Sequence, residues 1–328
     1  MTSINRRISV APMMDWTDRH CRYFHRRFSK HAVLYTEMVT AAAVVHGNRD
    51  HLLGYHEDEH PVALQLGGSD PALLTEATRI ACDYGYDEVN LNIGCPSDRV
   101  QSGSFGAVLM ENPALVANCA AAMIKASTGP EITIKCRIGV DDQAPEEILP
   151  EFLSRVSAAG IRSFSVHARK AWLQGLSPKE NRDVPPLDYE LVHAMKRLFP
   201  GLEICINGGI SSLEQVQTHL DAGVDGVMIG RTAYHEPAKI LASVDQQFFG
   251  GPSTTTAEQA VLDMLPYIES ELGKGARLNQ ITRHMLGAFA GRPGARRWRR
   301  VISEGAHLEG AGPELVLSAL GEIRRLAA

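Results

Sequence analysis

The repeated alternation of short apolar runs with segments of helical spacing constrains the fold of this chain more than any other feature. Eight runs rich in β-branched residues recur up to residue 229. They are Ile8–Met13, Leu34–Val39, Pro61–Gly67, Glu88–Ile93, Ile132–Ile138, Phe164–His167, Glu203–Asn207 and Gly226–Ile229. The segments between them, such as 71–84, 113–127, 146–159 and 213–222, carry apolar residues at helical intervals. Strands that alternate with helices in this way predict a parallel sheet.

Eight β/α units with continuously apolar strands close most naturally into a TIM (β/α)8 barrel, which takes about 250 residues. An open, doubly wound sheet is the alternative, but it predicts a Gly-x-Gly-x-x-Gly turn after an early strand, and the sequence has none. After the linker-like run GGPSTTT at 250–256 the spacing is helical without strand-like runs, and GRPG at 291–294 interrupts it. We therefore predict an α/β fold, with a TIM-barrel domain over 1–249 and a small C-terminal all-helical domain over 255–328.

Composition and cysteine usage narrow the class of protein. Apolar residues make up 44 % of the chain, which suits a large packed core, yet no apolar run approaches the ~18–20 residues of a membrane span. Met1–Ser9 lacks the apolar segment of a signal peptide. None of the six cysteines forms a Cys-x-x-Cys pair, and Cys82, Cys119 and Cys205 are predicted to be small core residues. We expect a cytoplasmic protein with no metal, no membrane association and no obligate protein partner.

Polar residues and glycines gather where the predicted strands end. In a TIM barrel the carboxyl ends of the strands form one face, and active sites lie there. In chain order the ends contribute Pro12-Met13-Met14-Asp15, Gln65 with Gly67-Gly68, Asn90 and Asn92 with Gly94-Cys95-Pro96, Lys135 and Arg137, His167-Ala168-Arg169, Asn207-Gly208-Gly209, and Gly230-Arg231. The sequence therefore predicts a functional site at this face.

The last two strand ends are typical of a phosphate site. Barrels often bind phosphate with the loops after strands seven and eight. In Asn207-Gly208-Gly209 and Gly230-Arg231 the glycines let backbone N–H groups approach an anion, and the arginine adds a charged donor. Plain turns after strands are the alternative interpretation, which the presence of both ends together makes less favourable.

Lys135 lies midway along an apolar strand, where a lysine is costly to bury without a partner. It is either half of a structural ion pair or a fixed cation beside a developing anion. His167, at the next strand end, is ambiguous by itself.

The net charge of −5 does not favour a nucleic-acid partner, but the charge is uneven. Residues 251–328 carry ten basic and eight acidic side chains, and five of the ten are Arg292, Arg296, Arg297, Arg299 and Arg300. A run of charges is often only a solvated helix face, but the interleaved Trp298 favours RNA binding here. Arg19, Arg22 and Arg26, which also have helical spacing, are predicted to form a solvated face.

At NLNIGCPS, residues 90–97, the chain resembles the tRNA-dihydrouridine synthase family. The resemblance extends over essentially the whole sequence and includes APMMDWTDRHCR at 11–22, YTEMV at 35–39, QLGG at 65–68, IKCRIG at 134–139, VHAR at 166–169, INGGI at 206–210 and MIGR at 228–231. The run GLSPKENRDVPPLDY at 175–189 is similar to the A-type branch, which acts on uridines 20 and 20a of the tRNA D-loop.

The resemblance implies bound FMN on the barrel and NADPH as the reductant. Carried over residue by residue, Pro12, Met13 and Met14 line the isoalloxazine ring. Gln65, Lys135 and His167 contact polar atoms of the flavin or its phosphate. Asn207, Gly208, Gly209, Gly230 and Arg231 hold the ribityl phosphate.

The resemblance also implies that the helical domain holds tRNA and that Cys95 is the catalytic proton donor. Similarity to the A-type branch suggests tRNA contacts at Asn92, Lys179, Arg182, Arg296 and Arg299. Hydride addition at C6 of uracil leaves enolate character at C5, which then needs a proton. A thiol that keeps its proton is a reasonable donor, and Cys95 lies in a turn at the predicted barrel rim. Two alternatives stay open: a flavin barrel acting on a free pyrimidine, and a tRNA-binding protein without catalysis.

Overall fold

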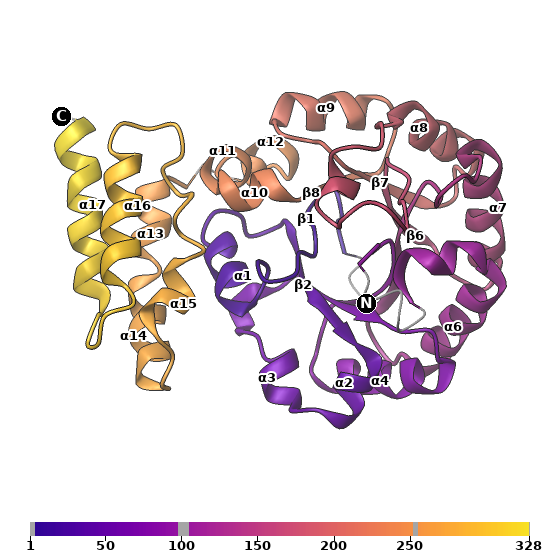
Figure 1. Cartoon of the computed structure of the whole chain (residues 1–328), viewed down its shortest axis with the longest axis horizontal. Coiled ribbons are helices and arrows are strands. Elements are labelled where there is room, and N and C mark those ends of the chain that lie inside the picture. The colour runs from indigo at the N-terminus through magenta and orange to yellow at the C-terminus, as the bar shows by residue number, and fades with distance from the viewer. Residues whose placement is uncertain (1–3, 98–104, 252–254, 328) are drawn as a thin grey trace. The chain divides into compact units, whose positions relative to one another are not determined.

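The computed structural model of the chain describes residues 4–97, 105–251 and 255–327. Its eight strands are parallel, each pairs with the next along the chain, and β8 pairs with β1, so that they close into a barrel (Figure 1). The strands are β1 (Ile8–Val10), β2 (Val33–Thr40), β3 (Val62–Gly67), β4 (Glu88–Ile93), β5 (Glu131–Arg137), β6 (Ser163–His167), β7 (Glu203–Asn207) and β8 (Gly226–Ile229). The predicted TIM barrel is confirmed, and every predicted strand has an observed counterpart.

Helices lie outside the barrel in the connections between strands (Figure 1). They are α2 (Ala41–His46), α3 (Arg49–Leu53), α4 (Pro71–Asp83), α6 (Pro113–Ala126), α7 (Pro145–Ala158), α8 (Tyr189–Leu198) and α9 (Leu213–Asp221). Two short helices, η2 (Gly106–Glu111) and η3 (Glu180–Arg182), lie in the connections after β4 and β6. The start of α4 illustrates how the local sequence begins them. Asp70 Oδ1 accepts hydrogen bonds from the N–H groups of Ala72 and Leu73 at 2.8 and 3.4 Å, while Pro71 has no N–H to satisfy.

The first strand is shorter than predicted, since β1 ends at Val10. The N–H of Ala11 still donates to the carbonyl of Ile229 at 2.9 Å, but Pro12 has no N–H with which to continue the ladder. Residues 12–14 therefore leave the sheet as a loop at the carboxyl end of β1.

An ion-pair network occupies the amino ends of the strands, which we call the closed end of the barrel. Arg6 is 3 % exposed and donates to Glu88, Glu131 and Glu203, each at 2.7 Å. The hydroxyl of Tyr35 donates to the second oxygen of Glu88 at 2.6 Å. The three glutamates are the first residues of β4, β5 and β7, so one guanidinium joins three strands.

The barrel interior is apolar on one side and polar on the other. The apolar side is a core cluster of Ala11, Val33, Tyr35, Ala63 and Met228. On the polar side Gln65 Nε2 donates to Asn90 Oδ1, and Asn90 Nδ2 donates to Thr133 Oγ1, both at 2.8 Å. Residues two apart on a strand share a face, so this polar side continues towards the carboxyl ends of the strands.

The chain divides into two compact units. The first holds the barrel and consists of described residues within 1–14, 33–55 and 60–230; the second consists of those within 15–32, 56–59 and 231–328. The second unit contains α1 (Arg19–Arg26), η1 (Glu57–Glu59), α10 (Arg231–His235), α11 (Pro237–Leu241), α12 (Val244–Phe248), α13 (Ala257–Leu262), α14 (Leu265–Gly273), α15 (Leu278–Thr282), α16 (Ala295–Gly305) and α17 (Pro313–Ala327). These units are discontinuous along the chain and do not test the predicted domain bounds, so 1–249 and 255–328 stay a prediction. Part of the predicted linker, 252–254, lies outside the described residues.

Two arginines that we expected on a solvated face are buried. Arg22 and Arg26 are 4 % and 5 % exposed. Arg22 Nε donates to the carboxylate of Glu59 at 2.6 Å, and Arg26 donates to the main-chain carbonyl of the same residue at 2.8 Å. The expectation was wrong because η1, a separate segment, packs its glutamate against this side of α1.

The burial of Trp298 removes one argument for RNA binding by the arginine cluster, and the predicted burial of Cys82 was wrong. Trp298 is fully buried, donates from Nε1 to the carbonyl of Met285 at 3.1 Å and packs edge-on against Phe289, so it is a core residue rather than a surface for RNA bases. Cys119 and Cys205 are buried as predicted, but Cys82 is partly exposed, because it lies near the end of α4.

Candidate active site

The polar side of the barrel continues to the carboxyl ends of the strands, which we call the mouth. Asn92, 7 % exposed, donates from Nδ2 to Gln65 Oε1 at 2.8 Å. Its Oδ1 accepts the N–H groups of Gly94 and Cys95 at 3.1 and 2.9 Å. Gln65 and Asn92 therefore hold the beginning of the loop that follows β4. The roles predicted for them, a flavin contact and a tRNA contact, stay predictions.

Cys95 is fixed through both of its main-chain polar groups. Its N–H is bound by Asn92, and its carbonyl accepts the N–H of Ala107 at 3.0 Å. The thiol is half-buried and donates to Ser97 Oγ at 3.5 Å. Residues 98–104, which follow this turn, lie outside the described residues. The thiol thus has a defined position at the mouth, as a proton donor requires.

Lys135 lies directly opposite Asn92 in the β4–β5 register. It is half-buried, and its amino group makes no hydrogen bond or ion pair with any residue in the described ranges of the chain. Burial lowers the pKa of Lys135 from its ordinary value of 10.5 to about 8, an effect that the charge of Arg137 increases and that Cys95 opposes. The described residues therefore offer no structural ion pair for this lysine. The other interpretation, a fixed cation beside an anion, is favoured.

The backbone after β7 approaches its neighbours closely. Gly208 and Gly209 have φ values of 116° and 69°, in the region that favours glycine. A Cβ on Gly208 would lie 3.3 Å from the His167 ring, and one on Gly209 would lie 2.6 Å from Leu187. The hydroxyl of Tyr189 donates to the carbonyl of Gly208 at 2.7 Å. Only glycines fit this turn, in which Gly208 is buried and Gly209 is exposed. An exposed glycine backbone is what an anion cradle needs.

The neighbouring strand ends complete this side of the mouth. Asn207, 6 % exposed, donates from Nδ2 to the carbonyl of Met228 at 2.7 Å and so ties β7 to β8. A Cβ on Gly230 would lie 3.6 Å from the sulfur of Met13, so the loop after β1 reaches the end of β8. Arg231 follows directly as the first residue of α10.

In the loop after β1, Pro12 and Met13 are half-buried and Met14 is 53 % exposed. Apolar side chains at the rim of a polar mouth are suited to the face of an aromatic ring. Their predicted contact with the isoalloxazine ring stays a prediction.

Arg137, the last residue of β5, is 4 % exposed and joins two loops of the mouth. Its Nε donates to the carbonyl of Gly94 at 2.9 Å, and its Nη1 donates to the carbonyls of Lys170 and Asn181 at 2.9 and 3.0 Å. Burial lowers the pKa of Arg137 to about 10; Cys95 opposes this shift, and the charges of Arg182 and Arg169 add to it. The mouth is therefore rich in positive charge.

Two of the predicted tRNA contacts lie on the loop after β6. Lys179 and Arg182 are exposed, and the fully buried Asn181 lies between them in the chain. The Asn181 amide donates to the carbonyl of Trp172 at 2.8 Å and accepts the N–H of the same residue at 2.7 Å. A buried amide thus anchors a loop that presents two cations to solvent.

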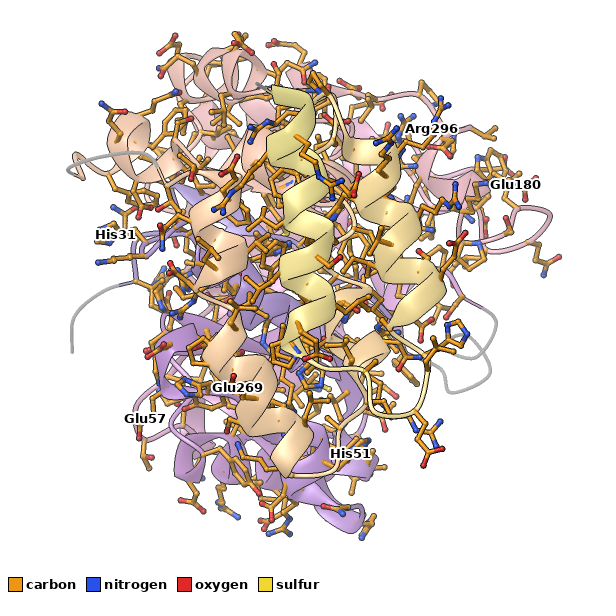
Figure 2. The ribbon with its side chains drawn as sticks, turned by 90° about the vertical axis from the view of Figure 1, so that its left-hand side faces the viewer. His31, His51, Glu57, Glu180, Glu269 and Arg296 are labelled. Carbon is orange, nitrogen blue, oxygen red and sulfur yellow. The ribbon has the colours of Figure 1, made fainter. Side chains whose placement is uncertain are left out.

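In the second unit, the clustered arginines divide into paired and unpaired ones. The paired ones are Arg292 with Glu258 at 3.4 Å, Arg297 with Glu322 at 3.2 Å and Arg300 with Glu304 at 3.1 Å. Arg296 and Arg299 are exposed on α16, as Figure 2 shows for Arg296, and neither forms a hydrogen bond from its side chain or an ion pair within the described part of the chain. Three residues apart, they share one side of the helix. The two arginines predicted to contact tRNA are the ones left without a carboxylate.

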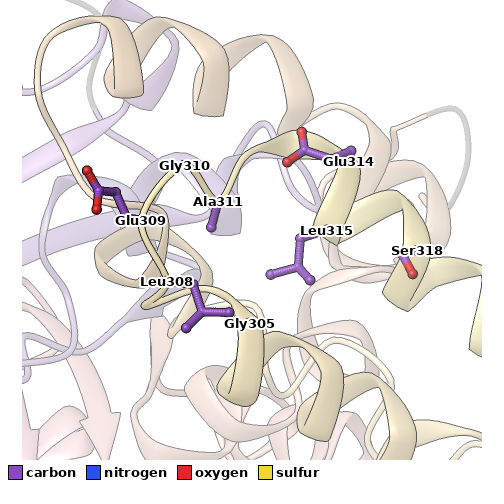
Figure 3. A pocket seen from close by; sticks show the side chains of 8 residues that line it. All are labelled: Gly305, Leu308, Glu309, Gly310, Ala311, Glu314, Leu315 and Ser318. Carbon is purple, nitrogen blue, oxygen red and sulfur yellow. The ribbon is translucent and has the colours of Figure 1, made fainter.

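A hollow of about 360 Å³ lies in the second unit where α16 is followed by α17 (Figure 3). It is lined by Gly305, Leu308, Glu309, Gly310, Ala311, Glu314, Leu315 and Ser318. This lining holds no cysteine, histidine or cation, so it lacks the chemistry of the barrel mouth. Across the described residues no three His, Cys, Asp or Glu side chains are grouped to hold a metal, and no helix is both long and apolar enough to cross a membrane.

The geometry defines a class of site. A thiol with a fixed backbone, a cation without a carboxylate among the described residues and a turn that only glycines fit all lie at the mouth of a TIM barrel. Barrel enzymes carry their active sites on this face. The arrangement suits a phosphorylated ligand and acid–base chemistry beside it.

Comparison with known proteins narrows this class. The sequence profile described as "Dihydrouridine synthase (Dus)" matches residues 9–323. The tRNA-dihydrouridine(20/20a) synthase of Shewanella oneidensis is 57 % identical over 315 residues, which cover 96 % of this chain and 93 % of that protein. The protein of the same name from Escherichia coli K12 is 57 % identical over 316 residues, covering 96 % and 90 %. The chain belongs to the dihydrouridine synthase family.

Solved structures with the same fold are more distant. The old yellow enzyme homologue from Zymomonas mobilis aligns with a TM-score of 0.53 at 13 % identity, over 77 % of this chain and 92 % of its own. Morphinone reductase aligns with a TM-score of 0.52 at 12 % identity, over 76 % and 87 %. At such low identity these likenesses establish the barrel fold alone.

The sequence places Arg137 at the end of a predicted strand but predicts no role for it. A signal was present, since Lys135 and Arg137 are two apart on one strand and must share its inward face. A second buried cation on the same face calls for partners from the neighbouring loops. Which carbonyls those are depends on the tertiary structure.

Proposed function

We propose that this protein is a cytoplasmic, FMN-dependent enzyme that reduces uridines 20 and 20a of the tRNA D-loop to 5,6-dihydrouridine, with NADPH as the reductant. The full-length relatives named tRNA-dihydrouridine(20/20a) synthase support the substrate. The observation that carries the chemistry is the fixed Cys95 turn at a mouth where Lys135 has no partner among the described residues.

The donors at the mouth fit FMN. Lys135 offers a cation for an electron-rich ring edge, and Gln65 and His167 offer polar atoms. The phosphate would be held by Asn207, Gly208, Gly209, Gly230 and Arg231, and the ring would lie against Pro12, Met13 and Met14. When bound, FMN supplies the hydride that reduces the uracil ring. The cation at residue 135 stabilises negative charge that forms next to it, because it is fixed in place before the charge appears.

Cys95 supplies the proton. The C5=C6 bond of uracil is conjugated with the C4 carbonyl, so hydride addition at C6 leaves negative charge on C5 and the carbonyl oxygen. Protonation of C5 by the thiol completes the reduction. Because Asn92 and Ala107 bind the backbone of Cys95, the thiol reaches this carbon in a defined geometry, and a positioned acid typically contributes about 10²–10⁴-fold.

Exposed cations on both units hold the tRNA. Lys179 and Arg182 on the loop after β6, and Arg296 and Arg299 on α16, contact phosphates, which set the register of an RNA without reading its bases. The side chain of Asn92 would reach the RNA through the N–H that Gln65 leaves unused. The target uridine must leave its stack to reach the mouth, and a loop base does so at low cost.

The test is to map dihydrouridine in tRNA from a strain that lacks this gene. We expect the modification to be absent at positions 20 and 20a, to return with the wild-type gene and not to return with Cys95→Ala. The purified protein should be yellow and contain FMN. Binding of tRNA by a protein that takes up no FMN would contradict the proposal, and so would reduction of free uridine in preference to tRNA.

A further inference from the structure

A single buried side chain connects the turn that carries Cys95 to the loop that carries Lys179 and Arg182. Arg137 donates to Gly94 in the first and to Lys170 and Asn181 in the second, at 2.9, 2.9 and 3.0 Å. All three acceptors are main-chain carbonyls, so the contacts hold the course of both backbones.

Burying the Arg137 guanidinium without a carboxylate lowers the stability of the fold. Arg137 is 4 % exposed and forms no ion pair with any carboxylate in the described part of the chain. A buried guanidinium is normally balanced by a carboxylate, as Arg22 is by Glu59 at 2.6 Å. Three neutral acceptors satisfy hydrogen bonds but supply no counter-charge, and they lie in two separate loops of the mouth that the arginine joins.

On the side of the thiol, the peptide of Gly94 is held from two directions. Its N–H donates to Asn92 Oδ1 at 3.1 Å, and its carbonyl accepts from Arg137. Cys95 follows directly, so a shift of the guanidinium reaches the thiol through one residue of backbone.

On the side of the RNA-facing loop, Asn181 acts as an anchor. Its carbonyl accepts from Arg137, and its side chain binds both main-chain groups of Trp172 and the carbonyl of Leu176. Lys179 lies two residues before it and Arg182 directly after it. A force on either cation is therefore transmitted to the carbonyl that Arg137 holds.

We propose that Arg137 is a positioning residue that couples engagement of tRNA by the loop after β6 to the placement of the Cys95 thiol. The inference rests on the proposed function. It predicts that proton donation is efficient only when both loops are joined through the guanidinium, so that a correctly bound tRNA aligns the acid that acts on its uridine.

The test uses the FMN-loaded, NADPH-reduced enzyme and follows reoxidation of the flavin by saturating tRNA in a single turnover. Arg137→Lys keeps the positive charge, but one ammonium cannot reproduce the planar fork that serves both loops. We expect the limiting rate to fall by about 10- to 100-fold, as for a misplaced reacting group. In a Cys95→Ala background the same substitution should cost less than about two-fold, because the group that it positions is already gone.

A second readout concerns tRNA. Lys179→Ala should raise the tRNA concentration that gives half the limiting rate, and this effect should shrink in the Arg137→Lys background, since the loop is no longer joined to the thiol. Strictly multiplicative effects of the two substitutions would overturn the coupling. An equal loss with and without Cys95 would overturn the positioning of the thiol.

Controls separate this role from simple loss of a buried arginine. Arg26, 5 % exposed, also donates to main-chain carbonyls, those of Ser29 and Glu59. Arg26→Lys should lower the melting temperature without lowering the limiting rate. If Arg137→Lys does not fold, Arg137→Gln, which is uncharged and can reach one loop, gives the same comparison. Failure of tRNA to reoxidise the wild-type enzyme would overturn the proposed function itself, whereas normal reoxidation by the folded Arg137 variants would overturn only this inference.

Discussion

The two ends of the barrel treat buried positive charge in opposite ways. At the closed end Arg6 is surrounded by carboxylates, with Glu88, Glu131 and Glu203 each at 2.7 Å. At the mouth Lys135 has no partner, and Arg137 has only main-chain carbonyls, among the described residues. At the closed end the cation is paired with carboxylates and holds three strands together, while at the mouth no carboxylate of the described residues pairs with Lys135 or Arg137.

The difference shows where this fold gives up stability for function. A fully paired network is costly to disturb, because removing one member leaves another buried charge alone. An unbalanced cation is already costly in the free protein and becomes favourable when an anion binds. Substitutions at the closed end should therefore change stability, and substitutions at the mouth should change binding and rate.

The largest effect expected is on the rate, from Cys95→Ala. Loss of a positioned acid should lower dihydrouridine formation by about 10²–10⁴-fold, while FMN content and NADPH oxidation persist because neither needs the thiol. Single-turnover formation of dihydrouridine in tRNA measures the first, and absorbance measures the other two. A loss of FMN together with activity would assign Cys95 a structural role and remove it from the functional end of the comparison.

Arg6→Ala should give the largest effect on stability. The fully buried Glu88 would keep its hydrogen bond from Tyr35 but lose its counter-charge, so we expect a loss of about 3–5 kcal/mol in the free energy of unfolding. Urea unfolding measures it. The double variant Arg6→Met with Glu88→Gln, which removes both charges, should be more stable than Arg6→Ala. If both variants lose the same free energy, the closed end is held by packing and not by balanced charge.

Lys135→Met should raise the free energy of unfolding of the flavin-free protein, whereas Arg6→Ala lowers it. Because burial lowers the pKa of Lys135 to about 8 from 10.5, the unfolded chain binds this proton more tightly, and the charged lysine destabilises the fold below pH 8. The penalty should disappear as the pH rises from about 8 to 10.5, and the wild type should gain of the order of 2 kcal/mol relative to Lys135→Met over that range. The variant should also bind FMN more weakly. If the free energies of unfolding of the two proteins change equally with pH across this range, Lys135 has a counter-charge in the folded protein.

The strands were predictable because in most of them at least every second residue is apolar and buried, as Val89, Leu91 and Ile93 are in β4. Glu88–Ile93, Glu203–Asn207 and Gly226–Ile229 have the predicted bounds. The mouth was predictable in the same way, since strand ends in a barrel share one face whatever the loops do. The largest difference is at the end of β1, where a proline without an N–H stops the ladder. The strands β2, β3, β5 and β6 differ from the predicted bounds by one residue at one or both ends.

The partners of charged side chains were not predictable. Arg22 and Arg26 on α1 are four residues apart, and Arg296 and Arg299 on α16 are three apart, so each pair shares one side of its helix, yet the first two are buried and the second two are exposed. The difference is made by Glu59, which a separate segment brings against α1. Periodicity reports which residues share a side of a helix, but not what packs against that side.

The contrast between balanced and unbalanced cations recurs on α16, where it gives the smallest expected effects. Arg296 and Arg299 have no carboxylate partner among the described residues, whereas Arg297 and Arg300 pair with Glu322 and Glu304. If the unpaired arginines contact tRNA phosphates, each replacement by alanine should weaken binding and flatten the slope of log K against log[salt] by about 0.7–0.9.

Arg297→Ala and Arg300→Ala are the matched controls, because these arginines are also exposed on α16 and their replacement removes the same charge. They should change the slope less, because an arginine already bound to a glutamate releases fewer ions from the RNA. FMN content should stay constant in all four variants. A filter-binding or fluorescence titration over a salt series gives the slopes, and mapping of dihydrouridine shows whether the modified position moves, as it would if lost phosphate contacts let the tRNA change its register. Equal slopes for the paired and unpaired arginines would mean that the ion pairs of α16 do not decide which arginines meet RNA.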